Sequence, residues 1–243
     1  MVKISGHSKW NNIKNKKEKT DAQRGKIFTK LGRELSIAVK QGGADPSSNA
    51  KLKDAIAKCK ANNMPNDNID RTIKKASGEG NASSYEEIVY EGYGPAGVAI
   101  IVEATTDNKN RTAADVRHIF DKFGGKLGTS GCVSFMFQKK GIIVIEKKDS
   151  IDEEELMMQA IEAGAEDLNA QEEYFEIITL PENFSSVTEK LEEAGYTFAE
   201  AEVQLIPDTY VTLDEKTTNR MRLIIENLED NEDVSNIYHN WEE

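Results

Sequence analysis

The chain has 243 residues, of which 38% are hydrophobic and 30% are charged. This length predicts two or three compact domains with cores of their own. The apolar stretches are no longer than a strand and the two cysteines are far apart, which excludes a membrane-spanning protein and a disulfide-rich one. The first twenty residues lack a signal or transit peptide pattern, so the sequence predicts a cytoplasmic protein with no membrane contact.

The formal net charge of -12 is unevenly divided along the chain. Residues 1–80 contain 18 Lys or Arg against 8 Asp or Glu, a balance of +10, and the remaining residues contain 13 against 35, a balance of -22. This division is typical of a basic binding module joined to an acidic body. A basic module predicts contact with a polyanion, and the alternative is a merely solvated basic surface.

The first third of the chain predicts a basic arm followed by three amphipathic helices. Residues 1–20 show no sustained period and are rich in lysine, which predicts the arm. Apolar residues then recur at helical spacing, giving a first helix that ends at Gly42, a second with Asp45 as its N-cap and a third over residues 66–77. They predict a nucleic-acid-binding bundle of helix-turn-helix type over residues 21–80, with the third helix as the recognition helix.

The rest of the chain alternates strand-length and helix-length patterns. Residues 139–206 follow the order βαββαβ, which predicts a ferredoxin-like domain. We expect residues 81–138 and 207–243, with a strand near Val133–Phe137, to form one discontinuous α+β domain around it. Its helices are expected at residues 112–123 and 215–228. The predicted fold class is multidomain α+β, with an N-terminal three-helix bundle followed by two α+β domains, one ferredoxin-like and inserted in the other.

No catalytic, cofactor-binding or metal site is predicted. Gly92, Gly94 and Gly97 spell the GxGxxG pattern of dinucleotide-binding loops, but a β-branched run follows instead of a helix, which predicts a turn between two strands. The three histidines have no partner at a motif spacing, and no pair among the many carboxylates stands out. We therefore expect a protein that is not an enzyme.

The candidate nucleic-acid-binding residues come from the arm and the bundle, because Lys and Arg can replace the counterions of a phosphate backbone. Trp10 could stack on an exposed base or could instead fix the arm to the protein's own surface. In the loop at residues 105–112, Lys109 and Arg111 could also meet phosphate, but the Asp and Asn spacing favours a helix cap. The predicted nucleic-acid-binding residues are Lys9, Trp10, Lys14, Lys16, Lys17, Lys19, Arg24, Lys26, Lys30, Arg33, Lys51, Lys53, Arg71, Lys74 and Lys75.

Five segments occur in an order that points to a known family. They are Gly6-His7-Ser8-Lys9-Trp10, Lys26–Leu35, YEGYGPAG at residues 90–97, TDNKNRT at 106–112 and GGKLGTSGCVSFMF at 124–137. Together they closely resemble the YebC/PmpR family of transcriptional regulatory proteins. Ala96 departs from the family pattern, in which Gly is expected. The resemblance implies three domains, the first of them helical, and a cytoplasmic protein that binds DNA and controls transcription.

The resemblance leaves the nucleic acid open between DNA and ribosomal RNA. A mitochondrial relative resembles a translational activator, and bacterial members are linked to ribosomes stalled on proline-rich sequences. Three hypotheses follow: a DNA-binding transcriptional regulator, a ribosome-associated translation factor that contacts ribosomal RNA, and a protein–protein adaptor that works through its acidic body. The sequence gives no expectation for the oligomeric state.

Overall fold

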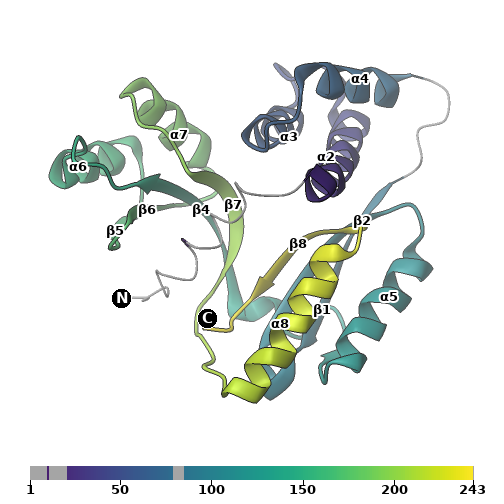
Figure 1. Ribbon diagram of the computed structural model, residues 1–243. Helices are drawn as coiled ribbons and strands as arrows, with labels where there is room; N and C mark the ends of the chain where they lie inside the picture. The colour runs from purple at the N-terminus through teal and green to yellow at the C-terminus, as the bar shows by residue number, and fades with distance from the viewer. Residues whose placement is uncertain (1–9, 11–20, 79–84, 243) are drawn as a thin grey trace. The chain divides into compact units, whose positions relative to one another are not determined.

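The computed structural model describes Trp10, residues 21–78 and residues 85–242 (Figure 1). Contacts divide the chain into two compact units. Among the described residues, the bundle-and-sheet unit comprises residues 21–78, 85–134 and 213–239, and the ferredoxin-like unit comprises Trp10 and residues 135–212 and 240–242. Helices come first and two antiparallel sheets with their helices follow, which confirms the predicted fold class. No helix of the described residues is both long and apolar enough to cross a bilayer.

Three helices open the bundle-and-sheet unit. They are α2 (Asp21–Gly42), α3 (Ala50–Ala61) and α4 (Asn66–Ser77). Leu35 of α2, Leu52 and Cys59 of α3 and Ile69 of α4 belong to one buried cluster. The apolar stripe of each helix thus faces the other two helices. The Lys and Arg residues lie on the remaining surface of each helix, which faces outward.

The expected start of the second helix at Asp45 is wrong. The Asp45 carboxylate instead accepts hydrogen bonds from the backbone and hydroxyl groups of Ser47, which closes a turn. Helix α3 begins after Asn49, whose side-chain oxygen accepts the Leu52 N–H at 3.1 Å. The amide nitrogen of Asn49 also donates to the Ala38 carbonyl at 2.7 Å, so this buried side chain joins the end of α2 to the start of α3.

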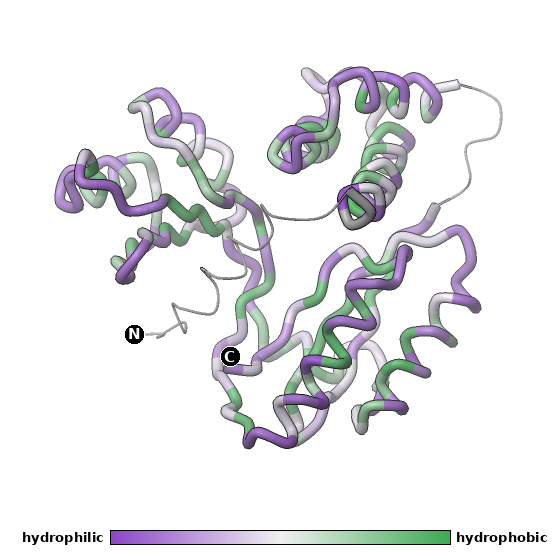
Figure 2. Tube along the Cα trace, viewed as in Figure 1, coloured by the Kyte–Doolittle hydropathy of each residue, from purple (hydrophilic) through white to green (hydrophobic). Residues whose placement is uncertain are grey.

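The sheet of the same unit has four antiparallel strands in the order β3-β1-β2-β8. The strands are β1 (Glu86–Tyr93), β2 (Ala99–Thr106), β3 (Lys126–Leu127) and β8 (Val234–His239). The helices are α5 (Lys109–Lys122) and α8 (Glu215–Asp230), and hydrophobic and hydrophilic residues alternate along α8 in Figure 2. Because β8 pairs with β2, the carboxyl-terminal tail completes the sheet that β1 and β2 begin.

The GxGxxG segment is a turn between two strands, as predicted. Residues Pro95–Gly97 form a single 3-10 turn, η1, between β1 and β2. Ala96 has a φ of +55° there, a left-handed conformation that suits the Gly expected at this position. Gly92 has a different reason to be glycine, because a Cβ atom would lie 2.7 Å from the Lys126 carbonyl oxygen of the neighbouring strand.

The expected strand at Val133–Phe137 is also wrong. The 3-10 turn η2 (Ser134–Met136) occupies most of it, and the strand begins only at Phe137. The buried carboxylate of Glu91 accepts the backbone N–H groups of Gly131, Val133 and Ser134 at 2.7, 2.9 and 2.8 Å. These N–H groups therefore bond to a side chain and are not available to a strand ladder.

The ferredoxin-like unit follows the predicted βαββαβ order. Its elements are β4 (Phe137–Glu146), α6 (Glu153–Ala163), β5 (Asp167–Ala170), β6 (Tyr174–Thr179), α7 (Phe184–Glu193) and β7 (Glu200–Pro207). The antiparallel sheet has the order β5-β6-β4-β7. Helices α6 and α7 cover one face of it (Figure 1), where Leu156 and Leu191 join the buried core. The other face carries a second cluster that includes Trp10 and Tyr174.

Candidate nucleic-acid interface

The bundle concentrates positive charge in the described part of the chain. Residues 21–78 contain twelve Lys or Arg against six Asp or Glu, a balance of +6. Because the apolar residues of α2, α3 and α4 face one another, these charges lie on the outside of the bundle. The groups that surround these basic side chains differ from helix to helix. Some of the side chains already pair with acidic groups of the protein, whereas others are available to a polyanion.

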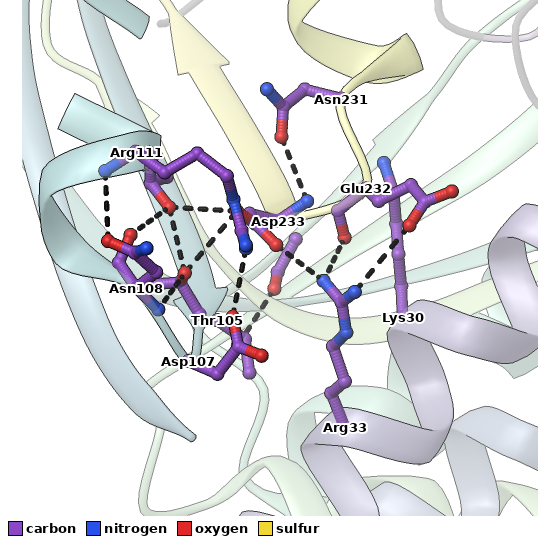
Figure 3. Close-up of polar contacts among 12 residues, drawn as sticks. Lys30, Arg33, Thr105, Asp107, Asn108, Arg111, Asn231, Glu232 and Asp233 are labelled. Atoms are coloured by element: carbon purple, nitrogen blue, oxygen red, sulfur yellow. Dashed lines mark hydrogen bonds and ion pairs between the residues drawn. The ribbon is translucent and has the colours of Figure 1, made fainter. Parts of the chain in front are cut away.

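The basic face of α2 contacts the protein's own acidic segment Glu229–Asp233 (Figure 3). Lys26 Nζ lies 2.8 Å from an Asp230 carboxylate oxygen, and Lys30 Nζ donates to the Glu229 carbonyl at 2.6 Å. Arg33 Nη1 donates to the Glu232 carbonyl and to Asp233 Oδ1, both at 2.7 Å. The three predicted phosphate-binding residues of this face are therefore occupied within the bundle-and-sheet unit.

Asp233 is the buried centre of a polar network, here the Asp233 network, with Arg33, Arg111 and Thr112. Only 4% of Asp233 is exposed, and it accepts hydrogen bonds from Arg111 Nη2 and from the Thr112 hydroxyl, each at 2.8 Å. Burial alone would raise the pKa of the Asp233 carboxyl, but these hydrogen bonds and the charges of Arg111 and Arg33 lower it below its usual value. The network joins α2 of the bundle to the amino-terminal end of α5 and to the start of β8.

The loop at residues 105–112 has the structural role that its Asp and Asn spacing favoured. Asn108 caps α5 by accepting the Arg111 N–H at 3.1 Å, so the helix begins at Lys109, three residues before the expected start at Thr112. Arg111 also pairs with Asp107 at 2.9 Å, and Lys109 pairs with Glu86. Both cations of the loop thus have carboxylate partners.

The exposed face of α4 differs from that of α2. Arg71, Lys74 and Lys75, here the α4 cationic face, are exposed, and their side chains form no ion pair or hydrogen bond with any described residue. Lys60 at the end of α3 shares this property and was missed by the sequence analysis, although it lies in the same basic last turn as Lys58. An alternative explanation for Lys74 and Lys75 is stabilisation of the negative carboxyl-terminal end of α4.

A groove of about 700 Å³ lies between α3 and α4. Lys53 and Lys60 contribute cations to its wall, Ile56 and Ile69 contribute apolar surface, and Asp70 contributes one negative charge. Helix α4 begins after Pro65 without any side-chain cap, so its first N–H groups carry the positive end of the helix dipole. The groove can therefore accept an anionic group, although Asp70 opposes it.

Trp10 is not placed to stack on a base. Its ring is 2% exposed and stacks on Tyr174 of β6, with 5.3 Å between ring centroids and 17° between planes. Of the two interpretations left open, the structure favours the one in which Trp10 fixes the chain to its own surface. The predicted arm residues Lys9, Lys14, Lys16, Lys17 and Lys19 lie outside the described residues.

The other predicted residues of the bundle also differ in their surroundings. Lys51 pairs with Glu87 at 2.8 Å on the surface, where 48% of each side chain is exposed. Arg24 and Lys53 are exposed and line two separate cavities of the bundle. Of the predicted set, only the α4 cationic face is exposed without a partner among the described residues.

Two carboxylates that organise these regions were missed because they looked like ordinary surface charges in the sequence. Asp233 lies in the run Glu229–Asp233, which reads as a solvated acidic segment. Glu91 alternates with apolar residues in β1 as a solvent-facing strand residue would, yet only 5% of it is exposed. Burial would raise the pKa of Glu91, but the three backbone N–H groups that it accepts lower it. Within the described residues, no group of three or more His, Cys, Asp or Glu side chains could hold a metal ion.

Comparison with known proteins places these features in a family context. The family described as "TACO1/YebC protein N-terminal domain" matches residues 8–79, and "TACO1/YebC second and third domain" matches residues 85–241. A probable transcriptional regulatory protein of Acetivibrio thermocellus is 65% identical over 239 residues, which cover 98% of this chain and 99% of the relative. A protein of the same name from Ruminiclostridium cellulolyticum is 66% identical over 241 residues, or 99% of this chain and 97% of the relative. The crystal structure of a conserved hypothetical protein from Aquifex aeolicus is similar with a TM-score of 0.82 and 46% identity, covering 93% of both chains.

Proposed function

The chain belongs to the TACO1/YebC family, and on that basis we propose that it is a non-enzymatic regulator of gene expression that binds DNA. The α4 cationic face, with Lys60 beside it, makes the contact with the phosphate backbone. The carrying observation is that these four cations are exposed and have no partner among the described residues. Relatives named as probable transcriptional regulatory proteins support the regulatory role.

Free cations bind phosphate more favourably than paired ones do. A cation that neutralises a phosphate releases a condensed counterion, and this release supplies most of the sequence-independent affinity. Lys26, Lys30 and Arg33 would first have to leave the acidic segment Glu229–Asp233, and Arg33 would abandon a carboxylate that is 4% exposed. The α4 cationic face has no such contact to break.

A salt titration tests this proposal. The affinity of the full chain for a labelled 30-base-pair DNA duplex would be measured by fluorescence anisotropy at several salt concentrations. Replacing Arg71, Lys74 and Lys75 with Ala should reduce the slope of log affinity against log salt by about 2.7, or about 0.9 for each lost phosphate contact. The cause is the loss of counterion release, so affinity should fall most at low salt.

A matched variant separates the position of the charges from their number. Lys216, Arg220 and Arg222 of α8 are also three exposed cations on one helix of the same unit, and their replacement with Ala changes the net charge equally. The α8 variant should keep the slope of the parent protein. Equal slopes for the α4 and α8 variants, or no capture of the duplex at low salt, would contradict the proposal.

A second candidate is a ribosome-associated translation factor that contacts ribosomal RNA. It is favoured by the small number of exposed base-reading side chains on α4, because Asn66 and Arg71 are exposed whereas Asn68 is half-buried. A contact made mainly with phosphate does not distinguish DNA from RNA. Sedimentation of a lysate through sucrose, with and without nuclease, tests this candidate. Nuclease-sensitive co-migration with ribosomes supports the RNA target, and absence from ribosomal fractions at low salt contradicts it.

A further inference from the structure

Helix α6 of the ferredoxin-like unit exposes three large apolar side chains. Met157, Met158 and Ile161 are 42%, 58% and 49% exposed, whereas Leu156 and Ala160 on the opposite side of the helix are fully buried in the core. On a helical wheel, on which each residue is rotated by 100° from the one before, the three exposed side chains fall within a single arc about 100° wide. Most proteins expose such residues singly, so three on one arc of one helix indicate a contact surface.

Negative charge surrounds this apolar group. Helix α6 contains four Glu and no cation, and the adjoining helix α7 contains three Glu and one Lys, which gives a balance of -6 over both helices. On the same helical wheel, Glu154 lies between the exposed apolar positions, and Glu155 and Glu162 lie just beyond Met158. We name the exposed residues of these two helices the α6–α7 surface.

The charge of the α6–α7 surface selects its partner. A nucleic acid would be repelled, because phosphate and carboxylate carry the same sign. A second copy of the chain meeting the first through the same surface would bring two such negative groups together, which is equally unfavourable. A cationic segment with apolar residues on one side matches both the exposed apolar group and the negative charge around it. Its apolar side covers the methionines, and its Lys or Arg residues meet the flanking glutamates.

We propose that the α6–α7 surface is a docking site for a cationic amphipathic segment of another protein. Methionine suits this contact because its unbranched, polarizable side chain adapts to partners of different shape. The site is distinct from the nucleic-acid contact proposed for α4, because it lies in the other compact unit and has the opposite charge. The chain thereby offers one surface to polyanions and another to polycations.

A synthetic peptide can test this docking site. The probe is a labelled 16-residue peptide of Lys and Leu, with Leu at helical spacing, and its binding to the full chain is measured by fluorescence anisotropy. Saturable binding is expected. Replacing Met157, Met158 and Ile161 with Ser should weaken it by at least about 10-fold, which corresponds to about 1.4 kcal/mol. Replacing Glu154, Glu155 and Glu162 with Gln should also weaken it and flatten its salt dependence.

Two controls identify the surface. Leu223 of α8 is also a large exposed apolar residue, at 41% of its surface, so L223S should leave peptide binding unchanged. A peptide with Glu in place of Lys should not bind to the full chain. Three simultaneous serine substitutions can themselves destabilise the fold. The single variant M158K therefore adds a charge of the wrong sign at the most exposed position and should weaken binding on its own.

Several results would overturn the proposal. Unchanged affinity in both the triple Ser variant and M158K would do so, as would an equal loss in L223S. Self-association in sedimentation that M158K abolishes would make a second copy the occupant. Tighter peptide binding, by about 10-fold, after replacing Lys14, Lys16, Lys17 and Lys19 with Ala would make the chain's own arm the occupant.

Discussion

Helices α2 and α4 each present three basic side chains on one face, and the two faces differ in what they contact. On α2, Lys26, Lys30 and Arg33 meet the acidic segment Glu229–Asp233 at distances of 2.6 to 2.8 Å. On α4, the side chains of the α4 cationic face form no ion pair or hydrogen bond with any described residue. A helical wheel shows two equivalent basic faces, and only the fold shows that one of them is engaged by an acidic segment of the same unit whereas the other has no ion-pair partner among the described residues.

The contact on α2 comes from the far end of the chain. Arg33 and Asp233 are 200 residues apart in the sequence, and no local pattern could have paired them. The acidic run that partners α2 is placed by α8 and β8, because it connects these two elements. The uneven distribution of charge along the chain therefore has a structural role in addition to the proposed functional one. Some acidic residues near the carboxyl terminus pair with basic residues of the bundle.

The largest effect is expected at Asp233. Replacing Asp233 with Ala removes the nearer and buried carboxylate partner of Arg33 and leaves only the exposed Glu232 carboxylate, at 3.6 Å. Removing one member of a buried ion pair costs about 3 kcal/mol. The free energy of unfolding from urea denaturation measures this loss. The neighbouring variant E232A serves as its control, because Glu232 is 66% exposed and its removal should cost less than about 1 kcal/mol. Equal costs for the two variants would mean that burial does not distinguish them.

The second effect separates the two basic faces. Replacing Lys26, Lys30 and Arg33 with Ala should lower the free energy of unfolding by about 2 kcal/mol, because these residues join α2 to the acidic segment. The same variant should change the salt slope of DNA binding by less than about one unit, in contrast to the α4 variant. A slope change as large as that of the α4 variant would show that the α2 face opens to bind phosphate.

The helices of the bundle and the element order βαββαβ of the ferredoxin-like unit were predictable, because the spacing of hydrophobic residues distinguishes helices from strands. Helix α4 begins and ends where the pattern places it, at residues 66 and 77. Strand β3 has only two residues and no pattern to detect. The start of α3 depends on whether Asp45 or Asn49 caps it, and the buried contacts of Asn49 with α2 decide this.

The sequence was sufficient to predict which basic residues belong to the candidate site, but not which groups each of them contacts. Composition and charge located the basic residues of the bundle, yet the sequence could not tell that Lys30 would meet a backbone carbonyl whereas Lys74 would face solvent. It also could not choose between the two interpretations of Trp10, since the ring partner Tyr174 lies in another part of the chain. Ion pairs and ring contacts between distant segments depend on the tertiary fold, and a local pattern contains no information about them.

The third effect is a pH dependence. The folded protein lowers the pKa of Asp233, because Arg111 and Thr112 donate hydrogen bonds to the carboxylate and outweigh its burial. An Asp carboxyl has a pKa of about 3.9 in the unfolded chain, and at pH values above this its ionised form contributes its full stabilisation to the folded protein. This stabilisation is lost as the pH falls through the lower pKa that the carboxyl has in the folded protein. The stability difference between the parent protein and D233N should therefore be constant from about pH 7 to pH 5 and narrow below about pH 4.

Urea midpoints at several pH values measure this narrowing. Asp230 provides the control, because Lys26 lowers its pKa as well but 78% of its side chain is exposed. Its replacement with Asn should give only a small stability difference at any pH, since solvent screens the pair. A D233N difference that persists unchanged at about pH 3 would mean that the Asp233 network does not depend on the ionised carboxylate.

The smallest effect is expected at the surface pair of Lys51 and Glu87, which is the intermediate case between the two helix faces. The pair is as short as that of Lys26 with Asp230, at 2.8 Å, but 48% of each side chain is exposed. E87Q should change the free energy of unfolding by less than about 0.5 kcal/mol, because solvent and side-chain entropy offset the attraction. It should also leave Lys51 available to phosphate, so the salt slope should stay the same or steepen slightly. A loss of stability comparable to that of D233A would show that ion-pair distance, and not burial, decides which basic residues of the bundle are structural.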